Sequence, residues 1–417
     1  MLSHKQFPPA SSRAFTLVEL LVAIMIGLLV GAAAVSFSRQ STRFFAQEAR
    51  IANAQMSVLA GFQRLQADVS RAAYMSTPDM RRDLIAQRLC APDYHTWPTE
   101  MQELTSIGII SVAGQPDTIR ISGNLASSET FDIFDIESGG SSSTIVLRRN
   151  RGPMTRAGFI EGYPGVDAAF QNVFRPGRLI RIADDRGQFE YQIIQASSFE
   201  NVPTITTIGT IPIIGDTGPA GDPALNTCGI AGRGRGMTLN PVSVVEYSIA
   251  SLETVSPYKE TIYHPDYAVT GSDDGRTELI RTEKLFLENS VDIQELVAEF
   301  AVDLRVGVWT TDNTIGVGVR RGAMTYISPE DASVATAPVA ESDPIEIVKG
   351  PTAIRMVDLR LVVRSREADR AEGIDSIANP LATDGYMFRA PIPGGRWARA
   401  RTLSSSVALM NHRGDAW

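Results

Sequence analysis

The feature that constrains this chain most is an apolar run of 23 residues, Phe15–Phe37. As a helix, a run of this length crosses the hydrocarbon core of a bilayer. One acid, Glu19, lies near its start, where a carboxylate in a spanning helix costs roughly 2.5–3.5 kcal/mol on insertion scales. A cost of this size predicts a partner for the carboxylate. Cleavage after Ala14 would free an α-amine on Phe15, one helical turn from Glu19, and this amine could pair with the Glu19 of its own or a neighbouring chain.

The 14 residues before the run are polar, carry Lys5 and Arg13, contain Pro8-Pro9 and end in the small Ala14. The string from Arg13 to Leu20, RAFTLVEL, resembles the class III leader and cleavage site of type IV prepilins and pseudopilins. Most members of that family have Gly before the cut, where this chain has Ala14. The resemblance implies that a prepilin peptidase cleaves before Phe15 and methylates its new amine, and that Glu19 acts in filament assembly.

Two other interpretations of the same run are an ordinary secretory signal, cut after Ala32-Ala33-Ala34, and an uncleaved membrane anchor. Both need only hydrophobicity, so neither explains Glu19. The positive charge before the run predicts that the N-terminus stays on the inner, cytoplasmic side of the membrane and that the body lies on the outer side. Within the run, Ala23, Gly27 and Gly31 have small-xxx-small spacing, which allows close helix packing but is also common in membrane helices generally.

The helix is expected to continue beyond the anchor as an amphipathic segment over residues 38–76. An apolar stripe recurs at helical spacing, and polar residues, among them Arg64 and Asp68, occupy the other side. Thr77-Pro78 predicts a stop and the start of a second short helix that reaches about Leu89. The members of the stripe are Phe44, Ile51, Val58, Phe62, Leu65, Val69 and Ala72.

Beyond Cys90 the apolar pattern changes to a period of two, which indicates strands. Clear examples are Val302–Val308 and Val357–Val363, and a hairpin is predicted with arms at 179–183 and 189–194. The sequence therefore predicts an α+β fold of pilin-like type, a long N-terminal helix packed on an antiparallel sheet. The predicted organisation is a leader at 1–14, a spanning helix at 15–37, its continuation at 38–76 and a body at 77–417 with a variable insertion around 90–240.

The two cysteines, Cys90 and Cys228, would both lie outside the cytoplasm, where disulfides persist. They can pair in only one way, and the pairing would tie a Gly/Pro-rich loop to the helical layer. Two unpaired thiols remain the alternative.

No catalytic, metal or cofactor motif is present in the sequence, so no enzymatic activity and no cofactor are expected. The acid pairs Asp184-Asp185 and Asp273-Asp274 lie in predicted turns, where acids are favoured without a metal. The net charge of −8 falls to about −10 once Lys5 and Arg13 leave with the leader. An acidic body gives no electrostatic footprint for nucleic acid, so no nucleic-acid partner is expected.

Two further strings narrow the resemblance. IRMVDLRLVVRSREADR, from Ile354 to Arg370, and ARTLSSSVALMNHRG, from Ala400 to Gly414, are similar to the late strands of PilW-type minor pilins. The resemblance implies a minor pilin that primes or caps a type IV pilus, anchored in the bacterial inner membrane with a periplasmic body and then placed near the pilus tip. Implied partners are the prepilin peptidase, the major pilin, other minor pilins, a tip adhesin and the inner-membrane assembly platform. Alternatives are a J-like minor pseudopilin of a type II secretion system and a membrane-tethered periplasmic enzyme.

Overall fold

The computed structural model describes residues 16–79, 104–139, 141–149, 152–200, 202–215, 229–252, 254–255, 276–311, 324–336, 350–365, 387–389 and 397–412. The chain divides into two compact units, Met1–Met56 and Ser57–Trp417. One helix, α1 (Leu17–Ser70), begins in the first unit and ends in the second. The predicted α+β fold is confirmed, since the rest of the body is built on antiparallel strands.

Helix α1 ends at Ser70, before the predicted end at residue 76. The residues that follow form turns, and Ala73 and Met75 have positive φ. The amide of Ala73 donates to Ser122 O rather than to the preceding helical turn, so a contact with a strand ends the helix. The second helix predicted from Thr77-Pro78 does not begin there, because Asp79 forms a β-bridge with Thr105; residues 80–89 lie outside the described residues.

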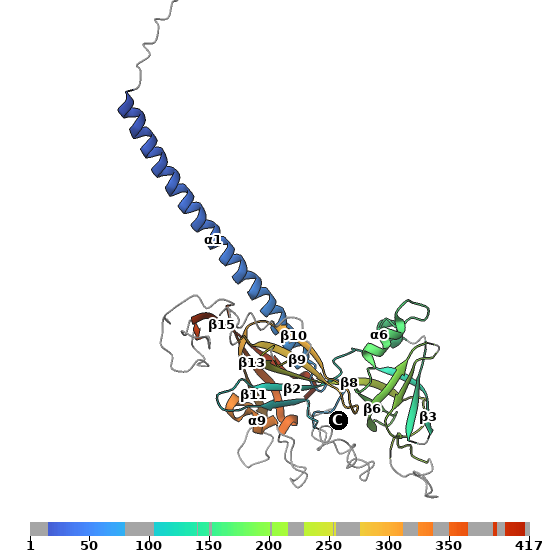
Figure 1. Cartoon of the computed structure of the whole chain (residues 1–417). Helices are drawn as coiled ribbons and strands as arrows, with labels where there is room; N and C mark the ends of the chain where they lie inside the picture. The colour runs from blue at the N-terminus through green and yellow to red at the C-terminus, as the bar shows by residue number, and fades with distance from the viewer. Residues whose placement is uncertain are drawn as a thin grey trace, which may run out of the picture. The chain divides into compact units, whose positions relative to one another are not determined.

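A ten-stranded antiparallel sheet forms the first part of the body (Figure 1). Eight strands follow the order β1-β2-β8-β3-β4-β7-β6-β5, while β9 pairs with β8 and β10 with β9. The strands are β1 (Ile107–Ile110), β2 (Thr118–Gly123), β3 (Phe131–Gly139), β4 (Ser142–Leu147), β5 (Leu179–Ala183), β6 (Phe189–Ser198), β7 (Thr204–Thr207), β8 (Thr238–Ala250), β9 (Glu278–Lys284) and β10 (Ile293–Ala298). The hairpin predicted at 179–194 is confirmed as β5–β6.

Strand β8 belongs to two groups of strands, which Figure 1 shows on either side of it. Its first residues pair with β3 on one side and with β5 on the other, so that β8, β3, β4, β7, β6 and β5 close into a barrel. Its later residues pair with β2 and β9. Closure leaves these barrel strands without a free edge and turns one face of each toward a common interior.

The barrel has its own apolar core. Four phenylalanine rings pack there, from β3 and from the two short helices α5 (Gly152–Arg156) and α6 (Val166–Val173) with their flanking loops. The centroids of neighbouring rings lie 4.7 to 5.3 Å apart. The rings are those of Phe131, Phe159, Phe170 and Phe174, joined by Ile133, Ile145, Ile182, Ile194 and Leu239. Five of the six barrel strands, β3 to β7, lie within the stretch 90–240, and β8 runs beyond it; the boundaries of this stretch as an insertion stay a prediction.

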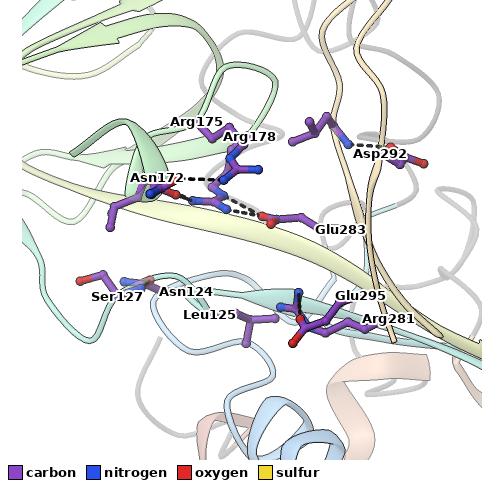
Figure 2. A network of polar contacts seen from close by, with 12 residues as sticks. Asn124, Leu125, Ser127, Asn172, Arg175, Arg178, Arg281, Glu283, Asp292 and Glu295 are labelled. Atoms are coloured by element: carbon purple, nitrogen blue, oxygen red, sulfur yellow. Dashed lines mark hydrogen bonds and ion pairs between the residues drawn. The ribbon is translucent and has the colours of Figure 1, made fainter. Parts of the chain in front are cut away.

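A buried arginine fastens the barrel to strand β9 (Figure 2). The Arg178 guanidinium donates from Nε to Glu283 Oε1 at 2.7 Å and from Nη1 to the carbonyls of Asn172 and Val173 at 2.7 and 2.5 Å. These carbonyls lie at the C-terminal end of α6, where backbone acceptors lack helical partners. One side chain therefore caps α6 and forms an ion pair with a strand outside the barrel.

The second sheet has five antiparallel strands in the order β12-β11-β13-β15-β14. Both strand patterns predicted from alternation, at 302–308 and 357–363, are confirmed in β11 and β13. The strands are β11 (Ala301–Thr311), β12 (Met324–Ile327), β13 (Ile354–Arg364), β14 (Met387–Arg389) and β15 (Trp397–Ala408), with helix α9 (Pro329–Thr336) and the 3-10 turns η3 (Gly350–Ala353) and η4 (Met410–His412) beside them.

The main core lies where the last turns of α1 meet strands of both sheets. Val58, Phe62, Leu65 and Val69 of α1 are buried there, as the predicted stripe requires. They pack with residues such as Ile119 and Ile121 of β2, Tyr247 of β8, Leu304 and Val306 of β11 and Leu359 and Leu361 of β13. The turn at Asp117 joins the sheets, because its amide donates to Leu304 O and its carboxylate accepts the Val306 amide.

Candidate functional site

The first part of α1 is the candidate assembly site. Among the described residues, one helical stretch is long and apolar enough to cross a membrane, Leu17–Thr42, with a mean hydropathy of 2.6. Every side chain from Thr16 to Gln40 is exposed in the single chain. An apolar surface of this kind needs lipid or protein around it, because soluble proteins rarely expose contiguous apolar patches of such size.

Thr16 and Glu19 form a reciprocal cap at the start of α1. The Thr16 amide and Oγ1 each donate to Glu19 Oε2 at 3.0 Å, and the Glu19 amide donates to Thr16 Oγ1 at 3.3 Å. This is the capping box expected from Thr or Ser followed three residues later by Glu. Sequence reasoning missed Thr16, although its T-x-x-E spacing is visible in the sequence.

The cap already supplies the Glu19 carboxylate with partners inside the single chain. The carboxylate has local donors from Thr16, and it is aimed at the helix N-terminus, where the partial positive charge of the helix dipole lies. The amine of Phe15 would lie at this same end after cleavage. Ala14 and Phe15 themselves lie outside the described residues, so the predicted cut and the methylation of Phe15 stay predictions.

The three small residues of the anchor are open in the single chain. Ala23, Gly27 and Gly31 are exposed, and a Cβ built on either glycine would meet no atom within 4 Å. Their predicted role in packing against neighbouring helices stays a prediction. Cys90 and Cys228 lie outside the described residues, and so does their predicted disulfide.

Asp68 was predicted on the polar side of the helix, and the structure shows that this is wrong. Its side chain is buried, with Oδ2 accepting from Tyr247 Oη at 2.7 Å and from Arg281 Nε at 2.9 Å. Burial and the neighbouring Asp68 charge raise the pKa of Tyr247, so the phenol stays protonated as a donor. Arg64, one turn earlier, is the exposed polar residue that the pattern indicated. Asp68 thus fixes α1 to strands β8 and β9.

The one serine–histidine pair close enough to suggest catalysis among the described residues is buried. His412 Nε2 lies 2.8 Å from Ser106 Oγ, and His412 Nδ1 lies 3.0 Å from Pro351 O, a carbonyl that requires a donor. Burial lowers the pKa of His412 to about 4, so the ring is neutral at neutral pH. The arrangement ties the last described turn to Ser106, which immediately precedes β1, and to η3, and both side chains are buried away from any substrate.

No group of three His, Cys, Asp or Glu side chains able to hold a metal occurs in the described part of the chain. The Asp184 carboxylate is occupied by backbone amides, since it accepts from Arg186 and Gln188 of its own turn and from Ala231, 47 residues away.

Comparison with known families bears on the N-terminus alone. Residues 9–35 match the family model described as the prokaryotic N-terminal methylation motif. The N-terminus is that of a type IV prepilin-like protein. This matched segment contains the capped start of α1 and most of its exposed apolar stretch. It implies processing by a prepilin peptidase and association with components of a pilus or pseudopilus. No curated protein and no solved structure matches the chain.

Proposed function

We propose that this chain is a minor pilin of PilW type, a structural subunit that primes or caps a type IV pilus. The observation that carries the proposal is the methylation motif at 9–35 together with the exposed apolar part of α1 that it covers. A helix of this kind anchors the precursor in the inner membrane and then packs among other such helices in a filament core. The late-strand resemblance at Ile354–Arg370 and Ala400–Gly414 favours PilW type over the J-like pseudopilin, which shares the N-terminus.

In this proposal Glu19 acts through its charge. After cleavage, its carboxylate pairs with the methylated amine of Phe15 from its own or a neighbouring subunit, and the subunit enters the filament. The β-rich body remains outside the membrane and contacts other minor pilins, the major pilin and a tip adhesin. The capped geometry supports this role because the carboxylate already faces the end of the helix at which the amine is created.

The test compares three variants in cells that make the filament. Glu19→Ala removes both the cap acceptor and the charge, Glu19→Gln keeps an acceptor but removes the charge, and Thr16→Ala removes the cap but keeps the charge. We expect both Glu19 variants to be cleaved and inserted normally but depleted from sheared filaments, while Thr16→Ala enters filaments as the wild type does. Mass spectrometry of the N-terminus and immunoblots of membrane and filament fractions measure these outcomes.

Wild-type amounts of Glu19→Gln in filaments would show that charge pairing is not the role of this residue. A mature N-terminus at Val35 would overturn the prepilin interpretation as a whole. Loss of pili rather than of type II secretion on deletion of the chain separates the minor pilin from the pseudopilin.

A further inference from the structure

We propose that the outer face of the five-stranded sheet, around Trp309 and Tyr326, binds a neutral polysaccharide. This function is independent of the anchor helix and of filament assembly. It rests on the side chains that strand register brings together on the face of the sheet turned away from the core.

Alternation along the strands defines this face. In β13, Val357, Leu359 and Leu361 enter the main core, whereas Met356, Asp358 and Arg360 point to the opposite face and are partly accessible. In β15, the residues on the same face as these are hydroxylated and exposed, namely Thr402, Ser404 and Ser406.

Register places an apolar row across four strands. Tyr326 of β12 lies opposite Trp309 of β11, Trp309 lies opposite Met356 of β13, and Met356 lies opposite Ala408 of β15. Tyr326 is 45% exposed, although large aromatic side chains usually contribute to a core or an interface. Its neighbour on the same face, Met324, is 46% exposed and extends the row along β12.

The two rings are held in position. Their centroids lie 5.1 Å apart with the planes at 50°, and the Trp309 indole donates from Nε1 to Asp358 Oδ2 at 2.8 Å. Gly307 leaves room for Tyr326, because a Cβ at this position would lie 2.5 Å from the phenol oxygen. The aromatic surface is therefore fixed before any ligand arrives, which reduces the entropy lost on binding.

A polar row runs beside the apolar one. Asp358 lies opposite Ser406, and two residues further along the strand Arg360 lies opposite Ser404. Residues two positions apart in a strand lie on the same face and about 7 Å apart. The Asp358 row therefore lies about 7 Å from the aromatic row, and the Arg360 row about 7 Å further along. Together the rows offer an aromatic plane, the Arg360 guanidinium and the two serine hydroxyls, while the Asp358 carboxylate holds Trp309 in place. A sugar ring needs this combination, since it presents one face of C–H groups and a rim of hydroxyls.

Charge on the face favours an uncharged ligand. On β13 the partly accessible Asp358 and Arg360 carry opposite charges, and on β11 the buried Asp303 pairs with its neighbour Arg305. Arg305 is already engaged with Asp303 and Asp117. Balanced charge gives no electrostatic field that would attract an anionic polymer. The exposed serine and threonine hydroxyls can form hydrogen bonds with the uncharged hydroxyl groups of a sugar. A neutral chain of pyranose rings therefore fits the face better than a nucleic acid.

The test uses the full-length protein in detergent with three neutral hexasaccharides, of cellulose, starch and chitin type, followed by saturation-transfer NMR and titration. We expect saturable binding of at least one probe. Tyr326→Ala should weaken it roughly tenfold or more, about 1.4 kcal/mol. Tyr326→Phe should retain it because the ring remains. Replacing both Ser404 and Ser406 by Ala should weaken it severalfold.

Tyr163→Ala is the matched control, since Tyr163 is 64% exposed on the barrel loop before α6. It should bind each probe as the wild type does, and all variants should keep the wild-type melting temperature. The proposal is overturned if none of the three probes binds saturably, or if Tyr326→Ala and Tyr163→Ala weaken binding equally. It is also overturned if Tyr326→Ala abolishes self-association or pilin capture while sugar binding is unchanged, because the face would then be a protein interface.

Discussion

The two ends of α1 are parts of one helix stabilised in different ways. From Thr16 to Gln40 every side chain is exposed, the glycines have open space around them, and the contacts that fix the start are local, between Thr16 and Glu19. From Val58 to Val69 the helix buries one face against strands of both sheets, and Asp68 forms its bonds with β8 and β9. The first part is therefore an element awaiting a partner, whereas the second part already has one within the chain.

The comparison also shows what each part can tolerate. A change in the exposed part should affect membrane or filament contacts and leave the body unaltered. A change in the docked part should destabilise the body even when the helix itself would accept it.

Asp68→Ala should have the largest effect, because it leaves Arg281 buried without its closest carboxylate and removes the acceptor of Tyr247. Breaking a buried pair in this way costs about 3–5 kcal/mol of unfolding free energy. Denaturant unfolding of the full-length protein in detergent, followed by tryptophan fluorescence, measures it. Arg64→Ala is the control, since its side chain is 51% exposed and lies 3.8 Å from Asp68, and it should cost at most about 1 kcal/mol. Equal effects would show that Asp68 does not dock the helix.

Two buried groups should give the body opposite responses to pH. Burial raises the pKa of Glu278 to about 7, against the lowering effect of Arg276, so its folded form binds a proton more tightly than the unfolded chain. The unfolding free energy should therefore rise as pH falls from about 7 to 4.5. Burial lowers the pKa of His412 to about 4, so the unfolded chain takes up that proton first and stability should fall between pH 6.5 and 4.

These contributions offset each other in the wild type and separate in variants. Glu278→Gln should leave only the His412 response, in which the unfolding free energy falls by about 3 kcal/mol as pH falls from 6.5 to 4. His412→Gln should leave only the Glu278 response, in which the unfolding free energy rises as pH falls from about 7 to 4.5. The anchor part of α1 should keep its helical circular dichroism over the same range. Identical slopes for the two variants would contradict these assignments.

Gly61→Ala should have the smallest of the three effects and the clearest control. A Cβ at Gly61 would collide with the backbone carbonyl of Val297 in β10, so we expect a loss of about 1–3 kcal/mol despite the better helix propensity of alanine. Gly27→Ala meets nothing within 4 Å and should leave the unfolding free energy of the body unchanged. If Gly27 packs against neighbouring helices, this variant should instead be depleted from filaments. Equal stability of the two variants would mean that Gly61 does not contact β10.

Local signals predicted much of this molecule. The anchor depends on the length of one apolar run, and the buried stripe of α1 recurs at helical spacing. The strands β11 and β13 alternate cleanly between apolar and polar residues, and the β5–β6 hairpin is marked by its turn. The cap at Thr16 was also readable, since both of its residues lie within one helical turn.

Other features were beyond local reasoning because their partners lie far away in the chain. Asp68 was predicted on the polar side because its spacing is polar, yet Tyr247 and Arg281, which bury it, are 179 and 213 residues away. The end of α1 was predicted late because the strand carbonyl that holds Ala73 belongs to Ser122.

The sequence by itself determined the apolar helix, its continuation and the antiparallel character of the body, since propensity and periodicity act within a few residues. Only the tertiary structure decided that β8 pairs with both β3 and β5 and so closes a barrel, and that Tyr326, Trp309 and Met356 share one row. The physical reason is that register between distant strands is selected by packing of the whole core, and a strand's own sequence specifies which face is buried but not which strand lies beside it.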